Sequence, residues 1–411
     1  MREVVIVGGG VVGLWCAWHL QRAGVAVTIV DKDDLTDGCS YGNAGMIVPS
    51  HFIPMASPGI IAQGIRWMFK KDSPFYIRPR LNTALAQWLW MFYRSANSKH
   101  VNESMALLRD MHTESREEYR QLQQTPGFDF RFEQKGILML YRTPGAEEDE
   151  MRTAETAHHL GIEAHQMTLD QLSSLEPGLK MSVRGAVHYP GDAHLHPDHL
   201  MHQLKTHLLA NGAEILANQE VIRMEDLDNK GCRVSFRNHK VIETRQAIIA
   251  TGSWTSSLMK TAGYQLPVQD GKGYSMTLSN LSWRPSIPAI LHEARVAITP
   301  MGDDLRISGT LEISGMDGKI NPSKVNSILN AIPDYYSGSV INNPGPVWFG
   351  YRPCTPDGLP FIGRLRKGSS IVVATGHAMM GLSLAPVTGR MVRDIVLRDV
   401  HPHDKLLPLR F

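Results

Sequence analysis

Hydrophobic and polar residues are arranged along this chain in two distinct ways. The first is a set of short apolar runs, of the kind that forms strands buried on both faces of a parallel sheet. The clearest runs are residues 4–7, 25–30, 247–250 and 371–375. The first of them leads into a glycine-rich turn and then into helical spacing over 13–22, which ends at Gly24. Residues 4–30 therefore predict a β-α-β unit.

The second arrangement consists of strands joined by polar turns, which is typical of an antiparallel sheet. It covers residues 273–278, 289–299 and 304–313. Other segments predict surface helices and additional strands. The helices are expected over 104–124, 147–160 and 198–211, and the strands over 136–141, 213–222, 233–236 and 240–244. Because α/β segments occur at both ends and in the middle, we predict two interleaved domains.

The composition excludes several classes of protein. The 411 residues are 43% hydrophobic and 20% charged, which is typical of a globular chain and not of a disordered one. Lysine and arginine number 42 against 40 acidic residues, so the charge does not indicate a nucleic-acid partner. The cysteines Cys16, Cys39, Cys232 and Cys354 lie far apart. This spacing indicates neither a disulfide scaffold nor a thiolate zinc site, and it favours a reducing, cytoplasmic location.

The N-terminal apolar stretch matches a secretory signal in its length only. Arg2 precedes an apolar run that extends to Leu20, and small residues follow up to Ala26. Three glycines interrupt the run at positions 8–10, and Glu3 lies where a signal peptide carries basic residues. We therefore interpret this stretch as part of the folded domain. No later segment reaches the roughly 18–20 consecutive apolar residues that a membrane-spanning helix needs.

The most informative motif is Gly8-x-Gly10-x-x-Gly13, directly after the first predicted strand. The first glycine permits a tight turn, the second lets the backbone approach a pyrophosphate, and the third allows the helix to pack closely on the strand. Asp31 follows the second strand, 18 positions after Gly13, where an acid would bind ribose hydroxyls. The motif predicts a dinucleotide cofactor, but it does not distinguish NAD from FAD.

Four further stretches narrow this choice. They are SYGNAGM at 40–46, ATGSW at 250–254, GYRP at 350–353 with TPDG at 355–358 and Pro360, and GH at 376–377 with Gly381 and the APVTG sequence at 385–389. In this order they resemble the D-amino acid oxidase/dehydrogenase family of FAD enzymes, which includes glycine and sarcosine oxidases. Within that family the chain is most similar to the bacterial D-amino acid dehydrogenases. The resemblance spans nearly the whole chain and implies that the cofactor is FAD.

The resemblance also implies the architecture. We expect an α/β plus antiparallel-β fold, with a discontinuous Rossmann-like FAD-binding domain interleaved with a substrate domain that has a mixed or antiparallel sheet. The FAD-binding domain is assigned residues 1–50, 161–266 and 345–411, and the substrate-binding domain 51–160 and 267–344. The expected cofactor contacts are Gly8, Gly10, Val12, Gly13, Asp31, Lys32, Ser40, Asn43, Ala44, Gly45, Met46, Val221, Thr251, Gly252, Trp254, Gly350, Arg352, Gly376, Met380, Gly381, Leu382 and Ser383.

Arg352 is the leading candidate for substrate binding. Its GYRP sequence resembles the family's substrate-arginine segment, and guanidinium is suited to a bidentate pair with an α-carboxylate. Family oxidases often carry a tyrosine in the strand before a proline, but residues 296–300 read VAITP. Other groups must therefore shape the pocket, and the candidates are Tyr274, His51 and His377. A position alone does not assign these three a role, and each also fits a packing or surface position.

The resemblance implies oxidative deamination of a D-amino acid. Hydride would leave the α-carbon for flavin N5, and the imine would hydrolyse to a 2-oxo acid and ammonia. Backbone N–H groups near 380–382 would stabilise negative charge on the flavin. No convincing Asp/His dyad is evident, and none is required if the amine arrives unprotonated. The alternatives are oxidation of an imino acid or secondary amine (D-proline, a D-hydroxyproline, sarcosine or glycine) and, more remotely, a nicotinamide-dependent dehydrogenase.

Two other features have alternative interpretations. The histidines 194, 196 and 199 match no standard zinc spacing, so we predict no metal. The segments 66–71 and 87–94 combine aromatic and basic residues, which suits either a docked helix, the favoured interpretation, or a helix in a membrane interface. The expected partners are a small amino or imino acid and an electron acceptor (quinone, a redox carrier or O2). Peripheral contact with the inner face of the cytoplasmic membrane and homo-oligomerisation both remain open.

Overall fold

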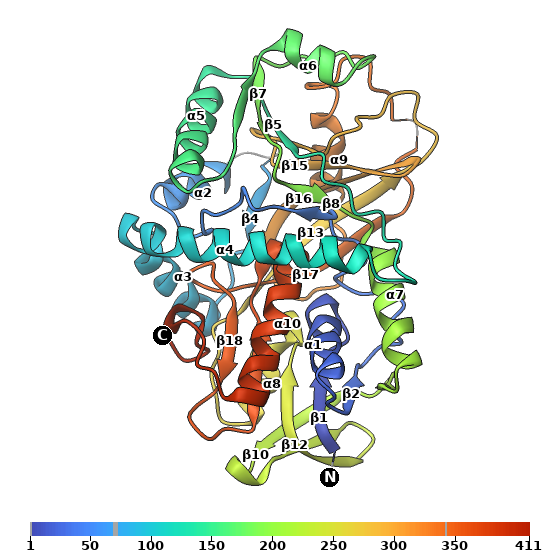
Figure 1. Ribbon diagram of the computed structural model, residues 1–411. Coiled ribbons are helices and arrows are strands. Elements are labelled where there is room, and N and C mark those ends of the chain that lie inside the picture. Colours follow the sequence, from blue (N-terminus) through green and yellow to red (C-terminus); the bar gives the residue numbers. More distant parts are fainter. Residues whose placement is uncertain (1, 69–72, 342) are drawn as a thin grey trace.

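The computed structural model describes residues 2–68, 73–341 and 343–411. Residues 69–72, which include Lys70 and Lys71 of the basic aromatic segment, lie outside the described residues. Figure 1 shows a lower body that contains the N-terminus and an upper body around a second sheet, with one long helix crossing between them. This arrangement confirms the predicted α/β plus antiparallel-β fold.

The first sheet forms the parallel core that the apolar runs predict. Its order is β10-β11-β12-β1-β2-β9, with β19 beside β12 and β18 beside β19. Strands β19, β12, β1, β2 and β9 run parallel, and β10, β11 and β18 run antiparallel. The bounds are β1 (Arg2–Val7), β2 (Val27–Val30), β9 (Glu214–Leu216), β10 (Val221–Asp226), β11 (Cys232–Phe236), β12 (Val241–Ile249), β18 (Phe361–Arg364) and β19 (Ile371–Thr375).

Both faces of this sheet are covered, which explains the continuous apolar runs. On one face Val4 and Ile6 pack against α1 (Val11–Arg22), α7 (Pro197–Ala210) and α10 (Gly381–Arg398). On the other face Val5 and Val7 pack with α8 (Thr255–Thr261) and the β10-β11 hairpin. Alternate residues of one strand therefore belong to two different cores.

The second sheet has the order β17-β13-β16-β15-β14-β5-β7-β6, with β4 beside β16. Its strands are β4 (Phe75–Ile77), β5 (Ile137–Tyr141), β6 (His165–Met167), β7 (Gly185–Tyr189), β13 (Gln269–Leu278), β14 (Ala289–Leu291), β15 (Val296–Met301), β16 (Asp304–Ile313) and β17 (Val347–Cys354). Most pairs of neighbouring strands in this sheet are antiparallel.

The outer helices are α2 (Ile60–Met68), α3 (Thr83–Ser95), α5 (Pro144–His159), α6 (Leu169–Leu175) and α9 (Pro322–Ala331). A short ladder of β3 (Met46–Ile47) and β8 (Ala193–His194) lies apart.

Two details differ from the sequence-based expectations. Residues 289–299 form two strands instead of one, because the chain reverses through a turn at 292–295 in which Arg295 has φ +53°. Residues 213–222 likewise divide between β9 and β10. The range 161–266 supplies β6 and β7 to the second sheet, and the range 345–411 supplies β17. The domain limits themselves stay a prediction.

Helix α4 (Ser98–Gln123) is the long helix that crosses between the bodies (Figure 1). It packs along α10, where the Tyr119 hydroxyl donates to the Leu382 carbonyl at 2.8 Å. The Tyr119 ring also meets Trp15 of α1 edge-on, with ring centroids 5.3 Å apart. The Ser115 hydroxyl accepts from the N–H of Val387 at 3.2 Å. Helix α4 thus braces the two helices that lead into the site described below.

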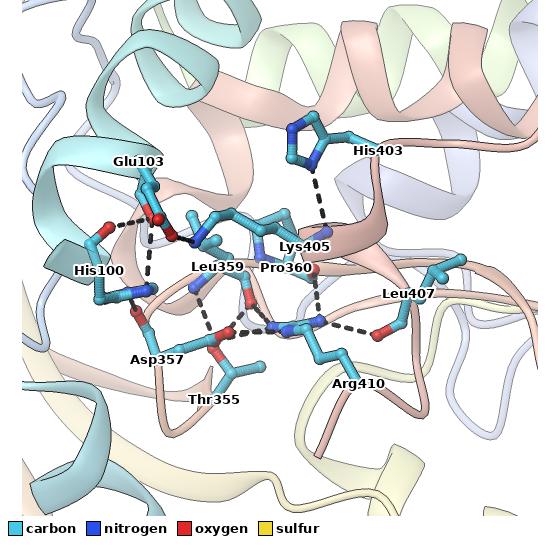
Figure 2. Close-up of polar contacts among 11 residues, drawn as sticks. His100, Glu103, Thr355, Asp357, Leu359, Pro360, His403, Lys405, Leu407 and Arg410 are labelled. Atoms are coloured by element: carbon cyan, nitrogen blue, oxygen red, sulfur yellow. Dashed lines mark hydrogen bonds and ion pairs between the residues drawn. The ribbon is translucent and has the colours of Figure 1, made fainter.

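The C-terminal segment ties together the loop that follows β17 (Figure 2). Arg410 makes a bidentate pair with Asp357 at 2.6 and 2.7 Å, and both side chains are buried. Arg410 also donates to the carbonyls of Leu359, Pro360 and Leu407. A second ion pair in the same region is more exposed to solvent. It joins Lys405 to Glu103 of α4 at 2.9 Å.

We predict that Arg410→Ala lowers the free energy of unfolding by about 3 kcal/mol, because it leaves the buried Asp357 carboxylate without its cation. Lys405→Ala is the matched control, and its exposed pair should contribute little that is measurable. Urea unfolding of both variants checks the difference. Equal effects would show that burial of the Arg410 pair does not matter.

Candidate active site

A cavity of about 1400 Å³ runs between the two sheets. Its floor is formed by the carboxyl ends of β1 and β19, and its roof by β13, β16 and β17. In open α/β sheets ligands bind outside the carboxyl ends of the strands. The cavity is large enough for a dinucleotide and a small substrate together.

The glycine motif forms one end of this cavity. Gly8 has φ +106°, and a Cβ there would overlap the carbonyl of Ala250. A Cβ on Gly13 would overlap the Gly8 carbonyl, so the helix packs closely on the strand as predicted. Gly10 is different, because a Cβ there would meet only the Ser40 hydroxyl, at 3.4 Å. The space beside Gly10 is therefore left open for a ligand.

Asp31 and Ser40 fix the shape of this end. The Asp31 carboxylate accepts from the N–H of Gly9 at 2.6 Å, and Ser40 Oγ accepts from the N–H of Val11 at 3.0 Å. Lys32 lies over the Trp254 ring, with its Nζ 4.4 Å from the centroid. Asp31 thus orders the loop, and it is also in the cavity wall where a ribose would lie.

A second helix begins at the same cavity. Helix α10 starts at Gly381 after a 3-10 turn over Ala378–Met380, and Met380, Gly381 and Leu382 line the cavity. The N-cap residues of α1 and α10 provide no side-chain cap, as in α7 and α8, whereas α3, α4 and α5 are capped by Asn82, Asn97 and Thr143. In α1 the N–H of Val11 is taken by Ser40, but the N–H groups of Val12 and Gly13 have no partner among the described residues. Uncapped N-termini offer free N–H groups and positive dipole ends. The N-termini of the two long helices α1 and α10 at one cavity fit a cofactor that carries a pyrophosphate and a second electron-rich group, as FAD does.

The loop at 40–46 joins the two sheets at this point. Arg306 of β16 donates to the carbonyls of Tyr41 and Asn43 at 2.8 and 3.0 Å. Ser275 of β13 donates to the Gly42 carbonyl at 2.9 Å. Gly45 has φ +79°, and a Cβ there would overlap the Leu195 carbonyl. The second sheet therefore holds in place the loop at 40–46, which the resemblance assigns to cofactor binding.

Arg352 of β17 lies in the cavity wall, and burial lowers the pKa of its guanidinium. Its Nη1 donates to the Thr310 carbonyl at 2.5 Å, and Thr310 has φ +67° at a bulge in β16. A positive φ is strained for a β-branched residue, so the backbone is distorted where it meets this arginine. Gly273 opposite makes room, because a Cβ there would overlap the guanidinium. Among the described residues no carboxylate lies within ion-pair distance of Arg352.

The other predicted substrate contacts differ in their surroundings. Tyr274 lies in the wall, but its hydroxyl donates to Glu312 at 3.1 Å and accepts from the Asn321 N–H at 3.1 Å. His377 Nε2 bonds to Thr388 Oγ1 at 2.9 Å, and burial lowers the pKa of its imidazole to about 3. Both polar groups are thus already engaged within the protein.

His51 belongs to a contact that the sequence analysis missed. Its Nδ1 lies 3.1 Å from Ser50 Oγ, and the Ser50 hydroxyl donates to Asp192. Asp192 also accepts from the Ser50 N–H at 3.0 Å and is fully buried. Burial raises the pKa of Asp192 to about 7 and lowers that of His51 to about 4, with Arg295 adding to the second shift. The sequence offers one hint of this contact: Asp192 lies next to the segment that contains histidines 194, 196 and 199. That segment was considered only for metal binding.

Further polar groups that were not predicted line the far end of the cavity. Arg295 lies in the turn between β14 and β15, with its guanidinium 5.9 Å from the Trp67 ring centroid. His292 pairs with the buried Glu150 at 2.6 Å. These side chains come from a turn and from α5, which are far apart in sequence. No local sequence motif could therefore have predicted that they meet.

Of the predicted residues, most line the cavity directly. These are Gly8, Gly10, Val12, Asp31, Lys32, Ser40, Asn43, Ala44, Met46, His51, Val221, Thr251, Gly252, Trp254, Tyr274, Gly350, Arg352, Met380, Gly381 and Leu382. Gly13, Gly45, Gly376 and Ser383 lie just behind this layer. Ser383 is buried and accepts from the N–H of Val48 at 2.9 Å, and Gly376, at φ +82°, packs against Thr355.

One cluster among the described residues has the geometry of a metal site. The ligand atoms of His196, Asp198 and His199 lie within 4.8 Å of one another. Arg131 and Arg306 both lie close enough to His196 to lower its pKa further, after burial and His199. Two neighbouring cations oppose a bound metal ion, so this juxtaposition does not change the prediction of no metal.

The family profile described as DAO, FAD dependent oxidoreductase, matches residues 3–395. The chain belongs to this family. It is 29% identical over 395 residues to a D-amino acid dehydrogenase of Helicobacter pylori, which covers 96% of this chain and 94% of the relative. A D-amino acid dehydrogenase of Xylella fastidiosa is also 29% identical, over 96% of this chain and 92% of the relative. In structure the chain is similar to glycine oxidase from Geobacillus kaustophilus, with a TM-score of 0.79 at 21% identity and coverage of 100% and 98%.

Membership of the DAO family makes the chain an FAD-dependent oxidoreductase that acts on amines or amino acids. The two uncapped helix N-termini and the open space beside Gly10 fit that cofactor. Which residues contact FAD stays a prediction. None of the helices in the described residues is long and apolar enough to cross a membrane.

We predict that Gly10→Ala weakens FAD binding at least tenfold while the apoprotein keeps its melting temperature, because the added methyl meets only Ser40 and extends into the cavity. Gly145→Ala in α5 is the matched control, since Gly145 does not line the cavity and a Cβ there meets nothing within 4 Å. Fluorescence titration of each apoprotein with FAD measures the affinity. Unchanged affinity in Gly10→Ala would place the pyrophosphate elsewhere.

Proposed function

We propose that this protein is a D-amino acid dehydrogenase or oxidase that performs oxidative deamination. The single observation that carries the proposal is Arg352, an enclosed guanidinium in the cavity wall with no carboxylate partner among the described residues. A charge that is partly withdrawn from water without an ionic partner is costly, and a substrate carboxylate would offset that cost. The D-amino acid dehydrogenases at 29% identity support this substrate class.

The residues of the chain supply binding and orientation. Arg352 would hold the carboxylate through two parallel N–H donors, which fixes the position of the α-carbon. The N-termini of α1 and α10 would hold the pyrophosphate and the flavin. FAD, when bound, supplies the two-electron oxidant. The apolar side chains around the cavity, such as Met46 and Leu382, would exclude water from this region.

An imino acid or secondary amine is the alternative substrate class. Structural relatives include an L-proline dehydrogenase from P. horikoshii, with a TM-score of 0.71 at 19% identity, which shows a shared fold and no more. D-proline, a D-hydroxyproline, sarcosine and glycine all carry the carboxylate that Arg352 would bind. Comparing D-proline with D-alanine therefore separates the two classes.

We predict that D-alanine or D-proline bleaches the flavin absorbance under anaerobic conditions, and that the L-enantiomers do not. Arg352→Lys should need at least 100-fold more substrate for the same bleaching rate, because lysine cannot form the bidentate pair. Arg284→Lys, an exposed arginine paired with Asp303, is the control. Bleaching by neither compound would contradict the proposed substrate class, and normal bleaching in Arg352→Lys would remove Arg352 from the site.

We also propose that α2 and α3 contact a membrane surface from which an apolar acceptor such as a quinone reaches the cavity. Trp90, Tyr93 and Ile65 are 60%, 61% and 54% exposed, and Tyr93 and Ile65 also line the cavity. The range 51–97 contains six lysine or arginine residues and a single acidic one. Exposed aromatic and basic residues together favour an anionic lipid interface.

A sedimentation assay with vesicles of phosphatidylglycerol and phosphatidylcholine tests this contact. We predict that the double variant Ile65→Gln and Trp90→Gln binds at least tenfold more weakly than the unmodified protein. The control is Leu209→Gln with Leu397→Gln, which removes two apolar side chains, each 47% exposed, from α7 and α10. No binding of the unmodified protein, or equal loss in both variants, would contradict a membrane role for α2 and α3.

A further inference from the structure

A buried chain of polar groups leads from the cavity into the protein interior. The imidazole of His51 lines the cavity, and Ser50 Oγ lies between its Nδ1 and the carboxylate of Asp192. His51 Nε2 has no hydrogen-bond partner among the described residues. Because the Ser50 hydroxyl donates to Asp192, its oxygen is free to accept from Nδ1–H. This order leaves the lone pair of Nε2 facing the cavity.

From this geometry we propose that His51, Ser50 and Asp192 form a proton relay that deprotonates the ammonium group of the bound substrate. The proposal rests on the proposed function, since it needs an amino acid in the cavity. His51 would be the catalytic residue, because it touches the substrate. Ser50 and Asp192 would act through it.

The transfer is balanced within the relay. One N–H bond of the substrate ammonium breaks as an N–H bond forms at His51 Nε2. The Nδ1–H bond breaks as a new O–H bond forms on Ser50, and the former Ser50 O–H bond breaks as Asp192 gains the proton. The ammonium and the carboxylate thereby become a neutral amine and a neutral carboxylic acid. His51 changes tautomer and carries no net charge afterwards.

The surroundings favour Asp192 over His51 as the resting place of the proton. His51 faces Arg295 from the β14–β15 turn, which opposes a positive imidazole. His112 from α4 lies close to His51, and burial lowers the pKa of His112 to about 3, so it is neutral and adds no charge. Asp192 lies in the interior near Tyr189 of β7, and burial favours its protonated form more than the hydrogen bonds from Ser50 and the charge of Arg116 from α4 favour the carboxylate. A neutral imidazole that only passes the proton on therefore suits this site.

The chain offers a matched control for Asp192. Asp226, at the end of β10, also accepts from a serine hydroxyl, that of Ser369 at 2.6 Å, and from the N–H of Ser370 at 3.1 Å. Its side chain is buried, but it does not line the cavity. Asp226→Asn therefore reproduces the local change made by Asp192→Asn without reaching the proposed relay.

The kinetic test is the pH dependence of kcat/KM with D-alanine or D-proline. Asp192→Asn and His51→Gln should lower kcat/KM about 100-fold near pH 7.5, and the loss should shrink towards pH 10, where the substrate amine is largely deprotonated without help. In the unmodified enzyme kcat/KM should fall as pH drops below about 7, because Asp192 is then already protonated. A loss that is equal at every pH, or that Asp226→Asn shares, would overturn the relay.

A second readout needs no substrate. In the FAD-loaded enzyme, infrared spectra should show a carboxylic acid band that grows as pH falls through about 7 and is lost in Asp192→Asn, whereas the signal of Asp270, whose pKa is raised to about 6, should remain in that variant. Nitrogen-15 NMR should show His51 neutral, with its proton on Nδ1, over the same range. A histidine that titrates while Asp192 stays ionised would overturn the relay. If neither amino acid bleaches the flavin, the proposed function fails, and these two titrations still decide whether the relay exists.

Discussion

The close packing of α1 on α10 is the contact on which the site depends. A Cβ on Gly389 of α10 would overlap the backbone of Trp15 in α1, so the two helices approach to backbone distance. Their N-termini consequently open into the same cavity, although the helices begin 370 residues apart at Val11 and Gly381. Helix α4 holds this pair from the outside through Tyr119 and Ser115. Without that approach the positive ends of these two long helices would not meet at one cavity.

The distribution of charge in the cavity follows from the same arrangement. Each helix end and Arg352 contribute positive potential, whereas the acids in the wall are already engaged. Asp31 accepts from Gly9, and Glu150 pairs with His292. Asp192 is withdrawn behind Ser50. An anion that enters the cavity therefore meets donors that are fixed in advance, which is how a protein binds charge without reorganising.

How much could be predicted from the sequence differs between these parts. The glycine motif, Asp31 and the GYRP segment are local, since a turn, a strand end or a strand residue determines where each lies. The buried strands were equally clear, because a parallel sheet covered on both faces produces unbroken apolar runs. Ser50 and Asp192 are separated by 142 positions and meet only through the β3–β8 ladder, so no spacing could indicate their contact. The position of Arg295 at the cavity could not be predicted for another reason. The turn that carries it was included in the strand predicted over 289–299.

The strand order has a consequence for how the chain acquires its fold. The first half of β12 pairs with the neighbouring β11, but its second half lies between β1 and β19, whose register partners are more than 240 positions earlier and more than 120 positions later in the chain. Contacts of such long range delay folding, because loop-closure entropy is lost before the sheet gains its hydrogen bonds. Until β19 arrives, the apolar edge of β12 is open to association with other chains. Refolding yield should therefore depend on protein concentration more steeply than the stability of the finished fold would suggest.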